Sequence, residues 1–170
     1  MISTGSGLRI SLRLGAKIMN NMMFRKKIPD DEGQFKTYNN TRFPAIKPRK
    51  IINELKKSEV GREALAYLEK HNVPVYLCSG VDSENWMCGF YDKFEDTITI
   101  YCDKLDGKKE IAKTVIHEAM HRRLGAKGTF EEEVKCYSQE HFHDHNELTD
   151  SDRQAIIKMV EALYKNRGLL

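Results

Sequence analysis

The stretch TVIHEAMHRRLG, residues 114–125, is the most informative part of this 170-residue chain. It contains the pattern H-E-x-x-H, in which His117 and His121 are four residues apart and Glu118 directly follows the first histidine. On an α-helix, side chains four residues apart lie on the same face, one turn apart. The spacing therefore lets both imidazoles face one point, where each can bind a zinc ion at a distance of ~2.0–2.1 Å.

The residues around the histidines predict a helix that is buried on one side. Five apolar residues repeat at helical spacing nearly opposite the two histidines: Ile111, Ala112, Val115, Ile116 and Ala119. Glu118 projects about 100° round the helix from His117, beside the ion rather than onto it. There its carboxylate can take a proton from water whose pKa the zinc ion has lowered. The alternative is a pair of surface histidines with a chance glutamate between them, because the motif is short.

A catalytic zinc site has three protein ligands, so two histidines require a third group. The extended pattern H-E-x-x-H-x-x-G-x-x-H is absent, because Leu124 stands in place of its glycine and Lys127 in place of its last histidine. A carboxylate from a following helix is the other solution. The segment TFEEEVKCY, residues 129–137, supplies three candidates just downstream: Glu131, Glu132 and Glu133.

The start of this segment resembles a capping box, with Thr129 as the N-cap and Glu132 three residues later. If Glu132 serves the cap, Glu133 is freer to reach the ion and is the preferred third ligand. Glu140, nineteen residues after His121, is a further candidate that needs a different packing of the two helices.

Outward from the motif, periodicity and breaker residues predict the other elements. Helices are expected at 49–58, 59–72, 108–124, 129–142 and 150–166, with Thr149 or Ser151 capping the last. Strands are expected at 73–80, 86–91 and 97–102, the last two forming an antiparallel hairpin in which 97–102 is half-buried. Regular structure is expected to begin after Pro48, apart from one strand near 8–14. This order predicts an α+β domain over 49–170 with a small, mostly antiparallel sheet, preceded by a weakly structured arm over 1–48.

Composition places the chain among ordinary globular proteins, with 40% hydrophobic and 31% charged residues. No run approaches the ~18 apolar residues of a membrane-spanning helix. Residues 1–27 carry six lysines and arginines and no acidic residue, within a net charge of only +3. Apart from Phe24 these residues lack interleaved aromatics, so no nucleic-acid partner is predicted. They lack the compact apolar run and the cleavage site of a secretory signal, so we expect action in the cytoplasm or delivery to a target cell as part of a larger protein.

The four cysteines, at positions 78, 88, 102 and 136, form no C-x-x-C pair and are expected to be free, mostly buried thiols. A second histidine cluster comprises His141, His143 and His145. One of these could polarise a substrate carbonyl, or the three could bind a metal, but a solvated helix end is favoured. Tyr137 and Tyr164 are possible oxyanion donors, with packing in the core favoured for each. Trp86 is expected in the core or on an edge strand.

With these residues in place, the sequence resembles the gluzincin class of zinc metallopeptidases. Several gluzincin families carry H-E-x-x-H and then E-x-x-A-[DY] on the next helix, and Glu133 to Tyr137 fit that pattern with Cys136 in the small-residue position. The resemblance implies a compact zincin-like (minigluzincin) domain, Zn²⁺ bound by His117, His121 and Glu133, and Glu118 as the general base. The strand TITIYC (97–102) looks like the edge strand along which such enzymes lay an extended peptide substrate.

The segments GFYDKFEDTITIYCD and KTVIHEAMH are also similar to compact metallopeptidase domains at the ends of bacterial polymorphic toxins. That resemblance implies an effector acting on a protein in a target cell, with an immunity protein as a possible partner. The alternatives are a housekeeping cytoplasmic metallopeptidase, a nucleic-acid binder, or a non-catalytic interaction module with a vestigial motif. The intact Glu118 argues against the last, because a purely structural zinc site closes its fourth position and needs no base.

Overall fold

Four strands and five helices make up the described part of the chain. The structure is a computed structural model and describes residues 32–39, 46–80, 87–166 and 168, so the expected strand near 8–14 and Trp86 lie outside it. In chain order the elements are β1 (Phe35–Asn39), α2 (Pro48–Leu55), α3 (Glu59–Lys70), β2 (Val75–Ser79), β3 (Gly89–Asp92), β4 (Thr97–Tyr101), a 3₁₀ turn (Cys102–Lys104), α4 (Gly107–Leu124), α5 (Phe130–Asp144) and α6 (Asp150–Asn166). All five helices and three of the four strands were predicted from the sequence, and the α+β class is confirmed.

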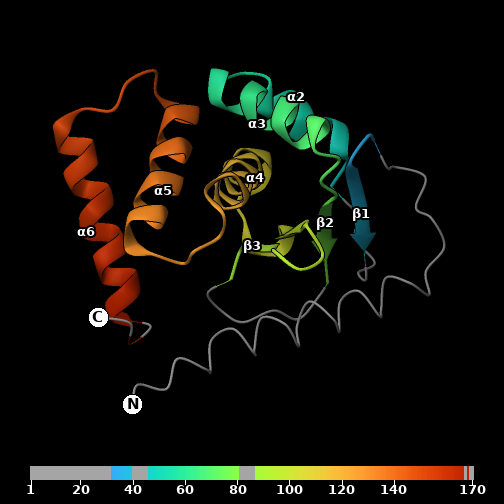
Figure 1. Ribbon diagram of the computed structural model, residues 1–170. Helices are drawn as coiled ribbons and strands as arrows, with labels where there is room; N and C mark the ends of the chain where they lie inside the picture. Colours follow the sequence, from blue (N-terminus) through green and yellow to red (C-terminus); the bar gives the residue numbers. More distant parts are fainter. Residues whose placement is uncertain (1–31, 40–45, 81–86, 167, 169–170) are drawn as a thin grey trace, which may run out of the picture.

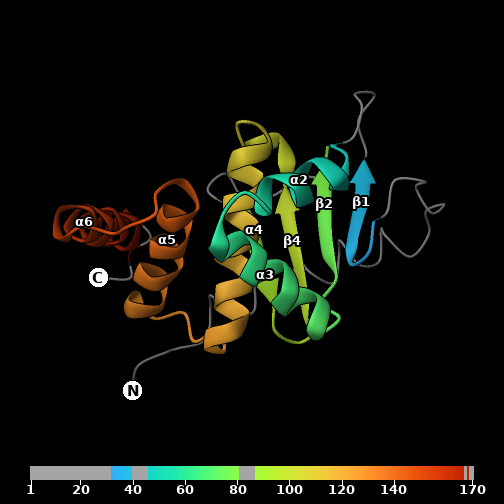
Figure 2. The same ribbon diagram turned by 90° about the horizontal axis from the view of Figure 1, so that it is seen from above.

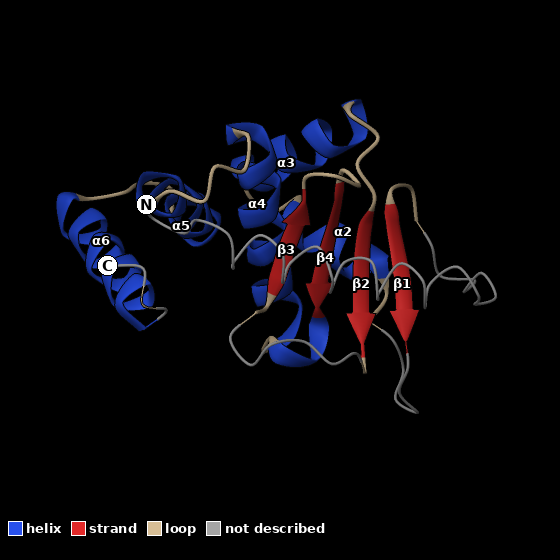
Figure 3. Ribbon diagram, turned by 60° about the horizontal axis from the view of Figure 1, so that its bottom comes forward, coloured by secondary structure: helices blue, strands red, loops and turns tan. Residues whose placement is uncertain are grey.

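The sheet has the strand order β1-β2-β4-β3 (Figure 3). β1 pairs with β2 and β2 with β4 in parallel, and only the β3–β4 hairpin is antiparallel, so the expected majority of antiparallel pairings is wrong. One parallel pairing comes from β1, which lies where regular structure was not expected, and the other arises because β2 pairs with β4 and not with β3, the next strand in the chain. The helices α2 and α3 connect β1 to β2, and such a crossover brings the next strand back parallel to the first.

The position of β4 in the sheet also differs from expectation. β4 lies between β2 and β3, so within the antiparallel pair the edge strand is β3 and not residues 97–102. All five side chains of β4 are buried, although alternation predicted a half-buried strand. On the side away from the helices, Tyr101 of β4 packs with Tyr38, Cys78 and Phe90 from the other three strands. Tyr76 of β2 and Phe90 of β3 lie opposite Thr99 on its two sides, so aromatic side chains of both neighbouring strands flank the face that alternation assigned to solvent.

Three helices, α2, α3 and α4, cover one face of the sheet (Figures 1 and 2). The core between them includes Phe35, Leu55, Leu68 and Ile100, all fully buried. The predicted apolar stripe of α4 faces this core, and each of its five residues is at most 4% exposed: Ile111, Ala112, Val115, Ile116 and Ala119. α4 is thus fixed in orientation, with its histidines turned away from the stripe.

The last two helices form a separate layer beside α4, at the left of Figure 1. α5 packs against α4, and α6 packs on α5 through a cluster that includes Ile156, Val160 and Val134. Both helices begin at the predicted threonines. The hydroxyl of Thr129 accepts a hydrogen bond from the amide of Glu132 (3.2 Å), and that of Thr149 accepts one from the amide of Asp152 (3.2 Å).

Gly61 marks a close approach between α3 and the end of α2. A Cβ atom at this position would lie 2.0 Å from the carbonyl oxygen of Leu55. We expect Gly61→Ala to lower the free energy of unfolding by about 1–3 kcal/mol, because the two helices must separate to relieve the overlap. Urea unfolding measures the change. Ala66→Gly, at an exposed position of the same helix, is the control and measures the difference in helix propensity between alanine and glycine, about 1 kcal/mol. A Gly61→Ala protein as stable as the parent, or more stable, would contradict the packing argument.

Candidate metal centre

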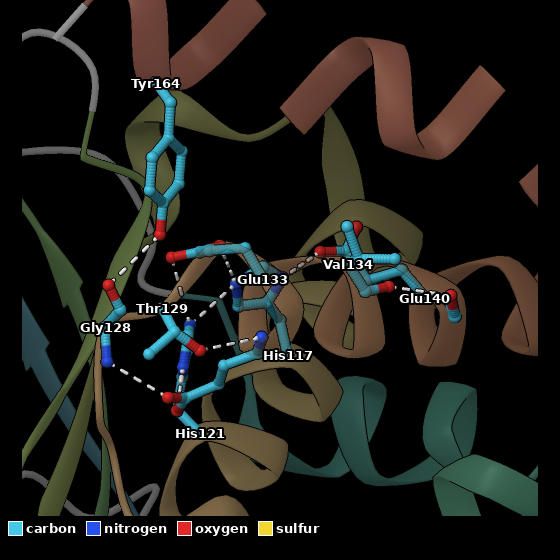
Figure 4. A network of polar contacts seen from close by, with 10 residues as sticks. His117, His121, Gly128, Thr129, Glu133, Val134, Glu140 and Tyr164 are labelled. Carbon is cyan, nitrogen blue, oxygen red and sulfur yellow. Dashed lines mark hydrogen bonds and ion pairs between the residues drawn. The ribbon is translucent and has the colours of Figure 1, made fainter. Parts of the chain in front are cut away.

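Two imidazoles of α4 face each other at the centre of the site (Figure 4). The Nε2 atoms of His117 and His121 are 3.1 Å apart. His117 is 7% exposed and His121 is partly buried. The four-residue spacing in the sequence therefore produces the expected convergence of ring nitrogens.

The carboxylate of Glu133, from the first turns of α5, meets the same two nitrogens. Its Oε2 lies 3.4 Å from Nε2 of His117 and its Oε1 lies 3.6 Å from Nε2 of His121. Ligand atoms bound to one tetrahedral zinc ion at ~2.0–2.1 Å are themselves about 3.3 Å apart. The three groups therefore have the chemistry and the mutual spacing of a zinc ligand set.

The remaining ring nitrogens each meet a different glutamate of α5. Nδ1 of His117 is 2.5 Å from Oε1 of Glu140, and Nδ1 of His121 is 2.8 Å from Oε1 of Glu132. Metal-binding histidines commonly donate their second N–H to a carboxylate, which fixes the ring orientation. Glu132 and Glu140, the alternative third ligands, thus lie on the far side of the rings from the point where the Nε2 atoms meet.

Glu132 is itself held in place from the other side. Its Oε2 accepts hydrogen bonds from the amides of Lys127 (2.7 Å) and Gly128 (3.0 Å). One half of the expected capping box is present, because the hydroxyl of Thr129 caps the helix. The other half differs, because one oxygen of Glu132 accepts from the amides of residues 127 and 128, ahead of the cap, and the other oxygen contacts His121. The turn before α5 thereby positions one histidine of α4.

Charge in the site favours a cation. Burial lowers the pKa of His117, but its contacts with Glu133 and Glu140 outweigh burial and raise that pKa to about 10. At neutral pH and without metal, His117 is therefore protonated among carboxylates. A bound divalent cation would take the place of this proton, since histidine binds metals in its neutral form.

Glu118 lies beside the histidines and is 6% exposed. Burial raises its pKa above the ordinary glutamate value, although the nearby His117 and His121 act in the opposite direction. A carboxylate whose pKa is raised toward neutrality is suited to accept and return protons.

Cys136 is the other potential ligand close to the histidines. Its Sγ lies within 4.8 Å of ring nitrogens of both. The thiol is fully buried, and burial strongly raises its pKa, whereas metals bind the thiolate. Glu133 presents one oxygen to each Nε2 atom, so it matches the histidines better than Cys136 does.

A cavity of about 420 Å³ opens onto these groups. α4 and α5 form one wall with His117, Glu118 and Tyr137, and residues 87–91 form the other. The second wall includes β3, whose outer edge pairs with no strand among the described residues. Since Cys88 accepts a hydrogen bond from Tyr101, ladder alternation turns the backbone N–H and C=O groups of Gly89 and Tyr91 toward this open edge.

The other residues singled out in the sequence have separate positions. The ring of Tyr137 contacts His117 edge-on, with centroids 4.7 Å apart, so it lines the cavity. The hydroxyl of Tyr164 donates to the carbonyl of Gly128 (3.2 Å), within the packing of α5 and α6 (Figure 4).

The second histidine cluster is only partly a solvated helix end. Nδ1 of His143 lies 2.6 Å from the hydroxyl of Ser58, the N-cap of α3, and burial lowers the pKa of this histidine. Nε2 of His141 is 3.2 Å from the carbonyl oxygen of Glu147. His145 is exposed, as expected. The four cysteines are free, with Cys88 partly exposed on the cavity wall.

Sequence reasoning missed the partners of the two Nδ1 atoms, although a signal for one was present. Glu133 and Glu140 are seven residues apart, so they lie on one face of a helix, as the two histidines do on theirs. Pairing two such faces places two carboxylates beside two imidazoles.

Comparison of the chain with protein-family models, curated proteins and solved structures finds no match. None of the helices in the described part of the chain combines the length and the apolar character that crossing a membrane requires.

Proposed function

We propose that this chain is a zinc-dependent peptidase of the gluzincin type, with His117, His121 and Glu133 as the zinc ligands and Glu118 as the general base. The observation that carries the proposal is the convergence of two Nε2 atoms and one carboxylate within 3.1–3.6 Å. The separate carboxylate on each Nδ1 atom supports it, because this arrangement presets both rings for a metal.

A zinc ion bound there would act as a Lewis acid on the substrate carbonyl and would lower the pKa of water. Glu118 accepts a proton from the water that attacks the carbonyl carbon. The same carboxyl group then returns the proton to the amide nitrogen as the C–N bond breaks, so no net proton is gained or lost by the protein. The buried setting of Glu118 supports both transfers.

The open edge of β3 supports an extended peptide as the substrate. Gly89 and Tyr91 offer backbone donors and acceptors along the cavity wall opposite the histidines. A peptide can add to such an edge as a further strand, with main-chain hydrogen bonds providing affinity. In this proposal β3 takes the role that the resemblance assigned to residues 97–102. The resemblance to toxin-associated domains adds a protein in a target cell as the substrate, and it stays a prediction.

The proposal is tested by removing and restoring the metal. A chelator removes the metal from the purified protein. Hydrolysis of unfolded, fluorescein-labelled casein is then measured by fluorescence, and the products are identified by mass spectrometry. We expect one zinc per chain before stripping, no hydrolysis after it, and recovery with one equivalent of Zn²⁺ but not with Mg²⁺, which prefers oxygen ligands. Undiminished hydrolysis by the stripped protein would contradict the proposal, as would a protein that binds no zinc.

The outer carboxylates provide a finer test of the site. We expect Glu140→Gln and Glu132→Gln each to weaken zinc binding by about 10–100-fold, because each removes the charged partner of one ring N–H. Competition with a chromophoric chelator measures the dissociation constant. Glu131→Gln, an exposed neighbour in the same turn of α5, is the matched control and should leave it unchanged. If all three variants bound zinc with the same dissociation constant as the parent, the Nδ1 contacts would be shown not to support metal binding.

A further inference from the structure

An ion pair joins α4 to the turn between β3 and β4, directly after the second histidine of the motif. Arg122 Nε donates to Asp96 Oδ1 at 2.6 Å and Arg122 Nη2 donates to Asp96 Oδ2 at 2.8 Å. This is the two-bond arrangement in which guanidinium and carboxylate geometries match. The Arg122 side chain is 15% exposed and the Asp96 side chain 45% exposed, so the pair is shielded from solvent mainly on the arginine side.

Two tyrosines extend this pair across the molecule. Arg122 Nη1 donates to the hydroxyl oxygen of Tyr67 in α3 at 2.8 Å, and the guanidinium carbon lies 5.3 Å from the centroid of the same ring. The hydroxyl of Tyr91, in β3, donates to Asp96 Oδ1 at 2.8 Å. One residue of α4 is thereby connected to α3 on one side and to the edge strand on the other.

The turn that carries Asp96 is also fixed by contacts of its own. Asp92 Oδ1 accepts hydrogen bonds from the amides of Phe94 (2.9 Å) and Glu95 (3.2 Å). Lys93 Nζ donates to the carbonyl oxygen of Gly125, just past the end of α4, at 3.1 Å. The hairpin therefore meets α4 at two points, and a shift of either would move β3.

The ion pair between Arg122 and Asp96 joins the two elements that form opposite walls of the cavity. β3 forms one wall of the cavity, and His121, which precedes Arg122, lies on the other. Neither Arg122 nor Asp96 lines the cavity or meets a histidine ring among the described contacts. β3 connects them to the cavity, because Tyr91 of β3 donates a hydrogen bond to Asp96 and also lines the cavity.

We propose that Arg122 and Asp96 are positioning residues that set the separation between β3 and the two histidines, and so determine how firmly an extended peptide is held opposite the metal centre. This inference rests on the proposed peptidase function. It assigns the pair to substrate binding and not to metal binding, which His117, His121 and Glu133 provide. Loosening the pair should leave the zinc content unchanged while the edge strand opens more often.

The experiment compares Arg122→Lys and Asp96→Asn with Arg123→Lys in the zinc-loaded protein. Lysine keeps the charge but cannot reproduce the paired bonds to Asp96 or the contact with Tyr67. Arg123 is the matched control, since it neighbours Arg122, is 55% exposed and lies 3.8 Å from Glu63. Its guanidinium carbon lies 5.9 Å from the centroid of the Tyr67 ring, and lysine keeps the positive charge that such a contact uses, so the control leaves the Asp96 pairing as the difference. Four quantities are measured: zinc per chain, melting temperature, kcat and KM on a labelled casein peptide, and hydrogen exchange of the Phe90 amide in the β3–β4 ladder.

We expect the two network variants to raise KM by about tenfold with kcat changed less than about twofold, because substrate positioning and not the proton-transfer groups is altered. Exchange at Phe90 should be faster than in Arg123→Lys, with zinc content unchanged. Two results would overturn the inference: KM and Phe90 exchange equal to those of the control, or a loss of zinc in step with a fall in melting temperature. If the parent protein hydrolyses nothing, the proposed function fails, and exchange at Phe90 alone decides whether the pair positions β3.

Discussion

Replacing Glu118 with glutamine is expected to lower kcat for peptide hydrolysis by a factor of about 10²–10⁴, the contribution typical of a general base. The amide has nearly the same shape but cannot accept the proton from water. Zinc content should stay at one per chain, because Glu118 contributes no atom to the group formed by His117, His121 and Glu133. The fold should also persist, since the substitution removes a buried carboxyl group whose pKa burial already raises.

The measurement is a comparison of kcat, zinc per chain and melting temperature for the parent and the variant. Glu110→Gln is a matched control, because Glu110 lies on the same helix and lines the same cavity but pairs with Lys113. A Glu118→Gln protein that cleaves as fast as the parent, or one that loses its zinc, would show that the roles are assigned wrongly.

Replacing Glu133 with alanine is expected to remove zinc binding at micromolar metal while the fold is kept. It deletes the only carboxylate of the described residues that faces both Nε2 atoms, at 3.4 and 3.6 Å. Zinc affinity should fall by more than the factor of about 10–100 expected for substitutions of Glu132 and Glu140, because a direct ligand is removed. Metal analysis after gel filtration, together with circular dichroism, gives the result.

Cys136→Ala separates the two possible ligand sets. Its thiol is near both histidines, but in our assignment it only fills the interface between α4 and α5, so zinc should be retained in full. Loss of zinc from Cys136→Ala with retention in Glu133→Ala would transfer the third position to the cysteine.

Much of this arrangement follows from local patterns in the sequence. The helix containing H-E-x-x-H, its buried stripe and the cap at Thr129 depend on residues within a few turns of each other, and spacing alone predicts them. The strand order depends on distant pairings. β1 is five residues long, FKTYN, without a clear run of apolar side chains, so neither it nor its parallel pairing with β2 could be predicted.

The choice among Glu132, Glu133 and Glu140 shows the same division. Each was a reasonable ligand, because sequence does not specify how α5 rotates against α4. The packing turns Glu133 toward the two Nε2 atoms and gives each neighbour one Nδ1 atom. The cap argument favoured Glu133, which does lie opposite the two Nε2 atoms, while the carboxylate of Glu132 contacts a histidine as well as the turn before α5.

The layered arrangement of the helices has a consequence for how this protein holds together. His117 and His121 belong to a helix embedded against the sheet, whereas Glu133 belongs to the α5–α6 pair packed outside it (Figure 1). A metal ion bound by all three would act as a cross-link between two layers of the molecule. Its binding free energy would then contribute to keeping the outer helices docked, so that loading with metal and completion of the tertiary structure become one linked equilibrium.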